Sequence, residues 1–204
     1  MGKGRLVIYG AADNGGRLAY DYLHGRRLND FDLIGFIDDH KMGKFAGFPI
    51  LGNKNDLQDI RERGIDNIVV FLMKDPIKRL ELCLELEKMQ FNFPNICGHN
   101  SEEGHIGKGV YVHESSVFLG FDQKVEDFTV IGPHTTIEGR TQIGRGSILC
   151  PYSFLGYNSR IGEASILYPR ASILPGVKIG DKCVVGYHVV QKKDMGNSKR
   201  SWKH

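Results

Sequence analysis

The sequence predicts two domains of different fold class, a small α/β domain with a parallel sheet followed by a parallel β-helix. Two observations predict this division. Residues 1–98 alternate short apolar runs with stretches of helical periodicity, whereas residues 106–185 carry an apolar side chain at almost every sixth position. A repeat this short is typical of a β-helix, in which every repeat supplies one strand and one corner of a coil.

The hexapeptide ladder is continuous from residue 131 to residue 185. Ten positions spaced by six are aliphatic, the residue two places before each is small or β-branched, and the residue after it is often Gly. The ten are Ile131, Ile137, Ile143, Leu149, Leu155, Ile161, Leu167, Ile173, Ile179 and Val185. We expect the aliphatic side chains to point inward and Gly to supply the corner torsions. Antiparallel hairpins would alternate with a period of two, so the period of six favours the β-helix.

The ladder begins earlier and is interrupted once. Ile106, Val112 and Phe118 share the step of six, but the next apolar position in frame with the later residues is Val125. One extra residue therefore lies between Phe118 and Val125. We expect the segment Leu119–Asp122 to bulge from the coil.

The first domain is predicted from its apolar runs. Four runs are predicted as strands, three helical segments separate them, and a short extended piece precedes the second helix. The strands are Leu6–Tyr9, Leu33–Ile37, Ile68–Leu72 and Phe91–Ile96, the helices are 17–24, 55–63 and 76–89, and the extended piece is Pro49–Gly52. Strands that alternate with helices indicate a small parallel sheet with helices on both faces, a Rossmann-like βαβ arrangement.

The turn after the first strand is a candidate phosphate site. Its residues Gly10, Ala11, Ala12, Asp13 and Asn14 lead from a strand into a helix, so backbone N–H groups and a helix N-terminus can face a phosphate. Ala12 replaces the second Gly of the dinucleotide fingerprint, and Asp13 would repel a diphosphate unless it points away. A tight connection without a ligand is the alternative interpretation.

The second strand ends in two acidic residues, Asp38 and Asp39. An acidic side chain at this place in a βαβ unit can meet the ribose or the base of a nucleotide. A solvated turn is the alternative interpretation. Together with the turn after the first strand, these residues form the predicted substrate site.

Composition and charge limit the classes of function. The net charge of +3 is too small to indicate a nucleic-acid partner, and no run of about eighteen apolar residues could span a membrane. The first residues lack the apolar stretch of a signal peptide, and the 4 cysteines show no metal-ligand spacing. We therefore expect a cytoplasmic protein without a metal site.

The domain boundaries follow from these patterns. We place the α/β domain at residues 1–98, the β-helix at 99–193 and a basic tail at 194–204, with the joint in the polar stretch 98–104. The tail lacks the ladder and is expected to fray. For Trp202 within it, docking on the β-helix and docking on a partner both stay open.

A small βαβ domain followed by a hexapeptide β-helix resembles one family, the bacterial sugar acyltransferases of the sialic acid O-acetyltransferase and bacillosamine N-acetyltransferase type. The matching pieces are the first strand with Gly10–Gly15, the stretches Gly35–Asp39 and Pro49–Gly52, and Pro175–Gly180. The resemblance implies a left-handed β-helix, a homotrimer, and transfer of an acetyl or other acyl group from acyl-CoA to a nucleotide-linked sugar. Many such proteins serve in surface-polysaccharide or glycan synthesis.

The resemblance also implies where the two substrates bind. The nucleotide sugar is expected in the small domain, and acyl-CoA is expected along the β-helix at two turns. Bulky side chains replace small ones at these turns, so the groove would be narrowed. Its residues here are Tyr168, Arg170, Gly186, Tyr187 and His188.

The catalytic pair that the resemblance implies is missing. Gly139 occupies the place of the His that acts as base, and Arg140 occupies the place of the acid that orients it. His134 and Glu138 are the candidate replacements, because an imidazole or a buried carboxylate can accept the proton. Further options are His113 and His188. A solvated corner residue is the alternative interpretation of each.

Two hypotheses about function remain. The first is an acyl-CoA-dependent sugar transferase with a rearranged site. The second is a trimeric sugar-nucleotide-binding or scaffold protein that has lost acyl transfer. NAD-dependent redox chemistry is a weak third, because the glycines of the first turn do not fit the fingerprint.

Overall fold

The computed structural model describes residues 3–26, 28–97 and 105–202. Contacts divide the chain into two units, the first made of residues 1–73 and 81–94 and the second of residues 74–80 and 95–204. The stretch 98–104, where the sequence places the joint, lies outside the described residues. Within the described part of the chain, no helix is long and apolar enough to cross a membrane.

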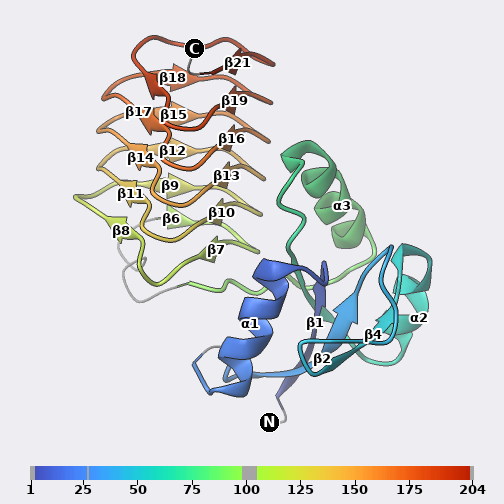
Figure 1. Cartoon of the computed structure of the whole chain (residues 1–204). Helices are drawn as coiled ribbons and strands as arrows, with labels where there is room; N and C mark the ends of the chain where they lie inside the picture. The colour runs from blue at the N-terminus through green and yellow to red at the C-terminus, as the bar shows by residue number, and fades with distance from the viewer. Residues whose placement is uncertain (1–2, 27, 98–104, 203–204) are drawn as a thin grey trace. The chain divides into compact units, whose positions relative to one another are not determined.

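The first unit is built on a five-stranded sheet (Figure 1). Its strands are β1 (Gly4–Tyr9), β2 (Phe31–Ile37), β3 (Lys44–Phe45), β4 (Phe48–Gly52) and β5 (Asn67–Val70). They lie in the order β3-β4-β2-β1-β5, and every pair is parallel except β3 with β4. The Rossmann-like sheet expected from the sequence is confirmed. Because β2 and β5 flank β1 on opposite sides, the end of β1 is the point at which such sheets bind ligands.

Four helical segments accompany this sheet: α1 (Asp13–Leu23), the 3-10 turn η1 (Lys54–Asp56), α2 (Leu57–Glu62) and α3 (Pro76–Lys88). Helix α1 begins four residues earlier than expected, because Ala12 is already its extended N-cap. Gly15 permits the close approach of α1 to β1, since a Cβ on Gly15 would collide with the Gly10 carbonyl oxygen. The start of α1 is therefore held against the turn that follows β1.

The first unit differs from the expectation at two places: one predicted strand was wrong, and one hairpin was not predicted. Phe91–Ile96 is not a strand; it contributes only isolated bridges, from Asn92 to Asn67 and from Ile96 to Tyr111. The β3–β4 hairpin was not expected at all. Its two-residue turn is Ala46-Gly47, and both residues have the left-handed torsions (φ 47° and 85°) that such hairpin turns require.

The second unit is a left-handed β-helix, as expected, with three parallel sheets (Figure 1). The β6–β18 sheet contains β6 (His105–Ile106), β9 (Lys124–Val125), β12 (Gln142–Ile143), β15 (Arg160–Ile161) and β18 (Lys178–Ile179). The β7–β21 sheet contains β7 (Tyr111–Val112), β10 (Val130–Ile131), β13 (Ile148–Leu149), β16 (Ile166–Leu167), β19 (Val184–Val185) and β21 (Arg200–Ser201). The β8–β20 sheet contains β8 (Val117–Phe118), β11 (Thr136–Ile137), β14 (Phe154–Leu155), β17 (Ser172–Ile173) and β20 (Val190–Gln191).

The interior of the β-helix is the predicted ladder. All ten ladder residues from Ile131 to Val185 are at most 3% exposed. The small column is buried too. Its hydroxyls other than that of Ser159 bind corner carbonyls, as when Thr135 Oγ1 donates to Gly132 O at 2.8 Å and Ser147 Oγ to Gly162 O at 2.7 Å. Small polar residues are selected here because they fill the corner and also satisfy backbone acceptors that no strand reaches.

The predicted bulge is present. Phe118 pairs with Ile137, nineteen residues away, whereas Ile137 pairs with Leu155, eighteen residues away. Gly120 and Asp122 have left-handed torsions (φ 84° and 62°), which let the extra residue turn outward.

The tail does not fray as expected. Arg200–Ser201 pairs with β19, and Met195 bridges to Ile179, so the chain continues the β-helix to its last described residues. Side chains from the tail hold it there, because Asp194 and Asn197 accept hydrogen bonds from the backbone N–H groups of Lys178 and Asp181. Trp202 docks on the β-helix, over Gly186.

Candidate functional site

The predicted phosphate turn is tied to the end of β2 by Asp38. Its Oδ2 accepts a hydrogen bond from Ala11 N at 2.8 Å, and its Oδ1 accepts from the backbone N–H groups of His40 and Lys41 at 3.0 and 2.9 Å. Partial burial works against ionisation, but these donors and the Lys41 charge outweigh it and hold the pKa of Asp38 below its usual value. Asp38 is therefore an anchor of the turn.

Asp39 is also engaged within the first unit. Its carboxylate accepts hydrogen bonds from the Tyr9 hydroxyl at 2.8 and 2.9 Å and from Lys54 N at 2.9 Å. Tyr9 is buried (1% exposed) at the end of β1. Burial first, and then the bond to Asp39, raise the pKa of Tyr9 well above its usual value. The pair fixes the position of the second acidic residue.

Exposed residues at the start of α1 and the Lys41 ammonium surround the turn that Asp38 holds. Ala12, Asp13 and Asn14 are exposed at the start of α1, whose first-turn N–H groups give that end a partial positive charge. Lys41 donates a hydrogen bond to the Ala11 carbonyl and lies 4.8 Å from the centre of the Phe45 ring. Lys41 thus brings a cation to the turn that offsets the charge of Asp13.

Sequence reasoning missed Tyr9 and Lys41. A Tyr at the last position of β1 reads in sequence as one more core residue. Lys41 follows a turn whose conformation is set by Asp38, three residues earlier. No motif of fixed spacing marks either residue, so only the fold brings them to the predicted site.

At the predicted catalytic corner, Glu138 has a structural role. Its Oε2 accepts a hydrogen bond from Tyr157 N, one coil further on, at 2.6 Å. Glu126 does the same, since it accepts from Arg145 N in the next coil, whereas Asp181 accepts from Glu163 N in the preceding coil. Glu138 belongs to this series of caps, in which each side chain satisfies a backbone donor of a neighbouring coil.

Gly139 is buried beneath the bulge. A Cβ added to it would lie 3.2 Å from the Phe121 carbonyl oxygen. The same carbonyl accepts a hydrogen bond from Arg140 N at 2.9 Å. The Arg140 guanidinium lies over the rings of Phe121 and Tyr157, 5.4 and 5.8 Å from their centres. Arg140 packs between aromatic rings and does not point to a catalytic partner.

His134 lies at the other end of β11, at a different corner. Its exposed ring stacks on Tyr152, with ring centres 4.8 Å apart. The Arg170 guanidinium lies 5.6 Å from the centre of the Tyr152 ring. His134, Tyr152, Arg170 and His188 repeat every eighteen residues with left-handed torsions (φ 56–62°). Among the described residues, His134 and Glu138 are not hydrogen-bonded to each other, so the two candidate bases are not brought together.

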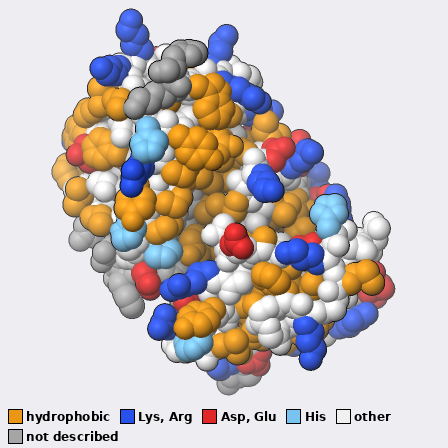
Figure 2. Space-filling model, viewed as in Figure 1, with side chains coloured by type: hydrophobic (Ala, Val, Ile, Leu, Met, Phe, Trp, Pro, Cys, Tyr) orange, Lys and Arg blue, Asp and Glu red, His pale blue; other side chains and the backbone are white. Residues whose placement is uncertain are grey.

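The turns predicted to form the acyl-CoA groove are filled. The Tyr168 and Tyr187 rings lie 4.7 Å apart, and the Trp202 ring lies 5.7 Å from that of Tyr168. Gly186 offers no space, because Trp202 covers it. Figure 2 shows hydrophobic and histidine side chains gathered on the visible surface of the β-helix.

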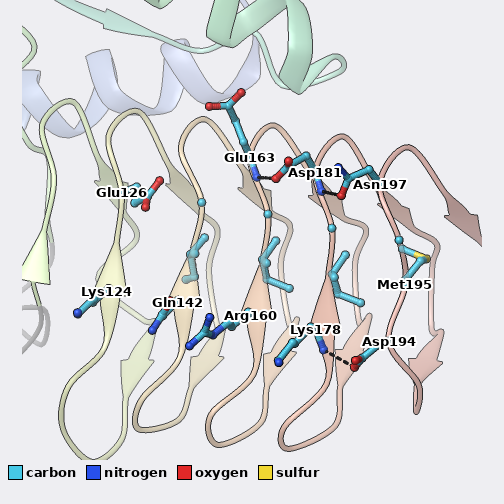
Figure 3. A pocket seen from close by; sticks show the side chains of 17 residues that line it. Lys124, Glu126, Gln142, Arg160, Glu163, Lys178, Asp181, Asp194, Met195 and Asn197 are labelled. Carbon is cyan, nitrogen blue, oxygen red and sulfur yellow. Dashed lines mark hydrogen bonds between the residues drawn. The ribbon is translucent and has the colours of Figure 1, made fainter.

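An open groove that the sequence did not indicate runs along the β6–β18 sheet (Figure 3). Its volume is about 530 Å³. Lys124, Arg160 and Lys178 lie on three of its strands, with Gln142 on the strand between the first two. Four acids also line the groove: Glu126, Glu163, Asp181 and Asp194. All four acids have partners in the chain. Glu163 pairs with an arginine at 2.8 Å, and each of the other three accepts a backbone N–H bond. The three cations form no ion pair within the described part of the chain.

No cluster of three or more His, Cys, Asp or Glu able to hold a metal ion occurs among the described residues. The cysteines are free thiols, and Cys83 and Cys183 are buried. Burial raises the pKa of Cys150 to about 11, so its thiolate is disfavoured at neutral pH.

The fold and this arrangement belong to a known structural class. Residues 158–190 match the family model described as bacterial transferase hexapeptide (six repeats). No curated protein matches the chain. The family match covers a part of the β-helix, in agreement with the hexapeptide ladder.

Solved structures extend the similarity to nearly the whole chain. PerB from Caulobacter crescentus, in complex with CoA and GDP-perosamine, is 23% identical over 96% of this chain and 92% of its own, with a TM-score of 0.85. The acetyltransferase domain of PglB from Neisseria gonorrhoeae, in complex with acetyl coenzyme A, is 22% identical over 98% and 96%, with a TM-score of 0.87. This chain therefore shares the two-part fold of these acetyltransferases, as the sequence resemblance implied.

Proposed function

We propose that the protein is an acyl-CoA-dependent transferase that acts on a nucleotide-linked sugar. The observation that carries this proposal is the similarity to PerB over both units of the chain, because that enzyme was crystallised with CoA and a nucleotide sugar. A protein that shared only the β-helix with PerB, for another function, would not be expected to have the α/β unit as well. The hydrogen bonds by which Asp38 and Asp39 hold the turn and the end of β1 support the same conclusion.

The nucleotide sugar binds in the first unit, with its diphosphate over the turn Gly10–Asn14. The N–H groups at the start of α1 and the Lys41 ammonium supply the positive charge. Asp38 and Asp39 hold the turn and the end of β1 in place and do not bind the ligand through free oxygens. This assigns the two acids a positioning role where the sequence favoured direct contact.

The acyl-CoA binds on the second unit, and we place it along the β6–β18 groove, whose four acids are engaged within the chain and leave its three cations to face the phosphates. Lys124, Arg160 and Lys178 supply cations along that groove. The corner of Glu138 and Gly139 leads directly into β12 of the same sheet. An acyl group reaching this corner would lie near Glu138, which then serves as the base once it leaves Tyr157 N.

The chemistry that the proposal requires is an acyl transfer. The sugar amine or hydroxyl attacks the thioester carbonyl, a base removes its proton, and the CoA thiolate leaves and is protonated. General-base catalysis contributes about 10²–10⁴-fold, so a displaced base leaves a slower enzyme that is still measurable. His134 is the second candidate for this role.

Release of the CoA thiol during incubation with acetyl-CoA and a panel of nucleotide sugars tests the activity. We expect turnover with at least one sugar carrying a free amine or hydroxyl, and loss of most of it in Glu138→Gln or His134→Ala. Glu62→Gln and His24→Ala, both exposed in the first unit, are the matched controls. Turnover that survives both test variants would exclude these residues as the base.

A second function is favoured by the filled turns and by the position of Gly139. A protein with no base at that corner and aromatic rings over the turns fits a binding or scaffold protein that keeps the sugar nucleotide and lacks transfer. Calorimetric binding of a nucleotide sugar, combined with no thiol release and no acetyl-CoA binding, would decide for it.

We further propose a homotrimer in the cytoplasm with a role in surface-polysaccharide or glycan synthesis. The sequence resemblance motivates the trimer, and the flat outer faces of the β-helix are suited to side-by-side contact. PerB and PglB support the sugar-nucleotide context through the ligands and domain named for them.

A further inference from the structure

A second pocket, of about 390 Å³, lies within the second unit between the start of α3 and the last coils of the β-helix. The segment Lys74–Leu80 belongs to this unit by its contacts. The principal lining residues are Lys74, Ile77, Ile166, Lys182, Arg200 and Trp202. Neither the predicted sugar-nucleotide site nor the β6–β18 groove includes these residues, but Tyr168 of the predicted acyl-CoA turns also lines the pocket.

The pocket carries an excess of positive charge. Lys74, Lys182 and Arg200 are exposed, and none of them forms an ion pair with any residue that the structure describes. Asp75 is the only acid in the lining, and its Oδ1 is occupied by the N–H groups of Ile77 and Lys78, at 3.1 Å each. Three cations around one partly neutralised carboxylate favour an anion with more than one negative charge.

The pocket also has an aromatic and apolar side. Trp202 is 45% exposed, and its ring is held by Gly186 and Tyr168. Ile166 is 3% exposed and closes the floor. In the β7–β21 sheet an outward apolar column ends in Arg200, which pairs in register with Val184. Fixed aromatic surface and unpaired cations therefore meet in one cavity.

We propose that this pocket binds a nucleoside phosphate, with the base against Trp202 and the phosphate between Arg200 and Lys182. A simple anion would not need the aromatic wall, and an apolar ligand would not need three cations. A volume of about 390 Å³ lies within the range of small-molecule sites. We expect a free nucleotide here, because the phosphates of acyl-CoA are assigned to the β6–β18 groove. The assignment requires no acyl transfer and is independent of the proposed activity.

Trp202 makes the test direct, because it is the single Trp of the chain. We expect AMP and ADP to change the tryptophan fluorescence of the whole protein saturably. The double variant Lys182→Ala/Arg200→Ala should weaken this binding about tenfold or more, since two charge-assisted contacts are lost. Lys192→Ala removes the same charge from an exposed position outside the lining and should leave the affinity unchanged. Circular dichroism checks that each variant is folded.

Inorganic pyrophosphate separates the contribution of Trp202 from that of the cations, and CoA tests whether the ligand is a free nucleotide. Trp202→Ala, followed by calorimetry, should weaken AMP binding and leave inorganic pyrophosphate unaffected. If CoA does not compete with AMP, a free nucleotide is the ligand, as we expect. If CoA competes, its nucleotide end occupies this pocket and the β6–β18 groove does not hold its phosphates. The proposal is overturned if AMP and ADP give no saturable change, if the double variant binds as the parent does, or if pyrophosphate alone binds as well as ADP.

Discussion

The peptide of Phe121 lies directly over Gly139: a Cβ on Gly139 would be 3.2 Å from the Phe121 oxygen and 3.4 Å from its nitrogen. Phe121 belongs to the bulge that the extra residue of the repeat creates. The missing side chain and the inserted residue are therefore two parts of one arrangement. A coil with a larger residue at position 139 would have to move the bulge.

Gly139→His should fail to raise acyl transfer. The new side chain would meet the backbone of Phe121, and moving that backbone would break the hydrogen bond that Arg140 N donates to it. We expect an unchanged or lower rate in the thiol-release assay and a loss of about 1–3 kcal/mol in the free energy of unfolding. Gly196→Ala, with open space around its Cα, is the control and should be near neutral. A rate raised tenfold or more by Gly139→His would contradict the closed corner.

Leu155→Asp should unfold the β-helix. Leu155 is fully buried in the ladder, and an unpaired carboxylate there costs several kcal/mol. Circular dichroism melting should show loss of the cooperative transition. Thr136→Asp, on the outer side of the adjacent strand, is the control and should retain a cooperative melt.

Tyr9→Phe should reduce the stability of the first unit and change its pH dependence. The variant removes the hydrogen bond that the buried Tyr9 hydroxyl donates to the exposed carboxylate of Asp39, at a cost of about 0.5–1.5 kcal/mol. Because the pKa of Tyr9 is raised on folding, its contribution is complete below the unfolded value of about 10 and is lost as the pH rises above that value. Denaturant melts from neutral to alkaline pH measure this. The parent protein should lose stability above about pH 10, and Tyr9→Phe should lose less.

Asp38→Ala should weaken binding of a nucleotide sugar without direct contact to it. The turn loses the bond to Ala11 N and the two bonds to the backbone of His40 and Lys41. We expect an affinity about tenfold lower by calorimetry, because the free turn must be ordered on binding. Asp32→Ala, exposed on β2, is the control. Equal affinities for the two variants would show that the turn does not hold the ligand.

Light scattering should give a mass three times 22.9 kDa at micromolar concentration. A trimer would bury part of the apolar surface that the single chain exposes, including Phe121 and Tyr157. A stable mass of 22.9 kDa would refute the trimer and with it any site shared between subunits.

The sequence by itself determined the β-helix. Its period of six repeats so often that the ladder, the small column and the single extra residue between Phe118 and Val125 could each be assigned from spacing alone. The same local logic placed β1, β2 and β5, since each is a short apolar run between turns. It failed for Phe91–Ile96, an apolar run that forms only isolated bridges, one to Asn67 of the edge strand β5 and one to Tyr111.

The hydrogen-bond partners of the candidate residues could not be predicted from the sequence. Asp38, Asp39 and Glu138 look like ligand-binding or catalytic groups in sequence, but each is occupied by a donor distant in the chain: Ala11 N, the Tyr9 hydroxyl and Tyr157 N. Trp202 docks because the last coil continues the β-helix over Gly186. Spacing along the chain fixes which side chains point inward, whereas hydrogen-bond partners come from segments that only the folded coils bring together.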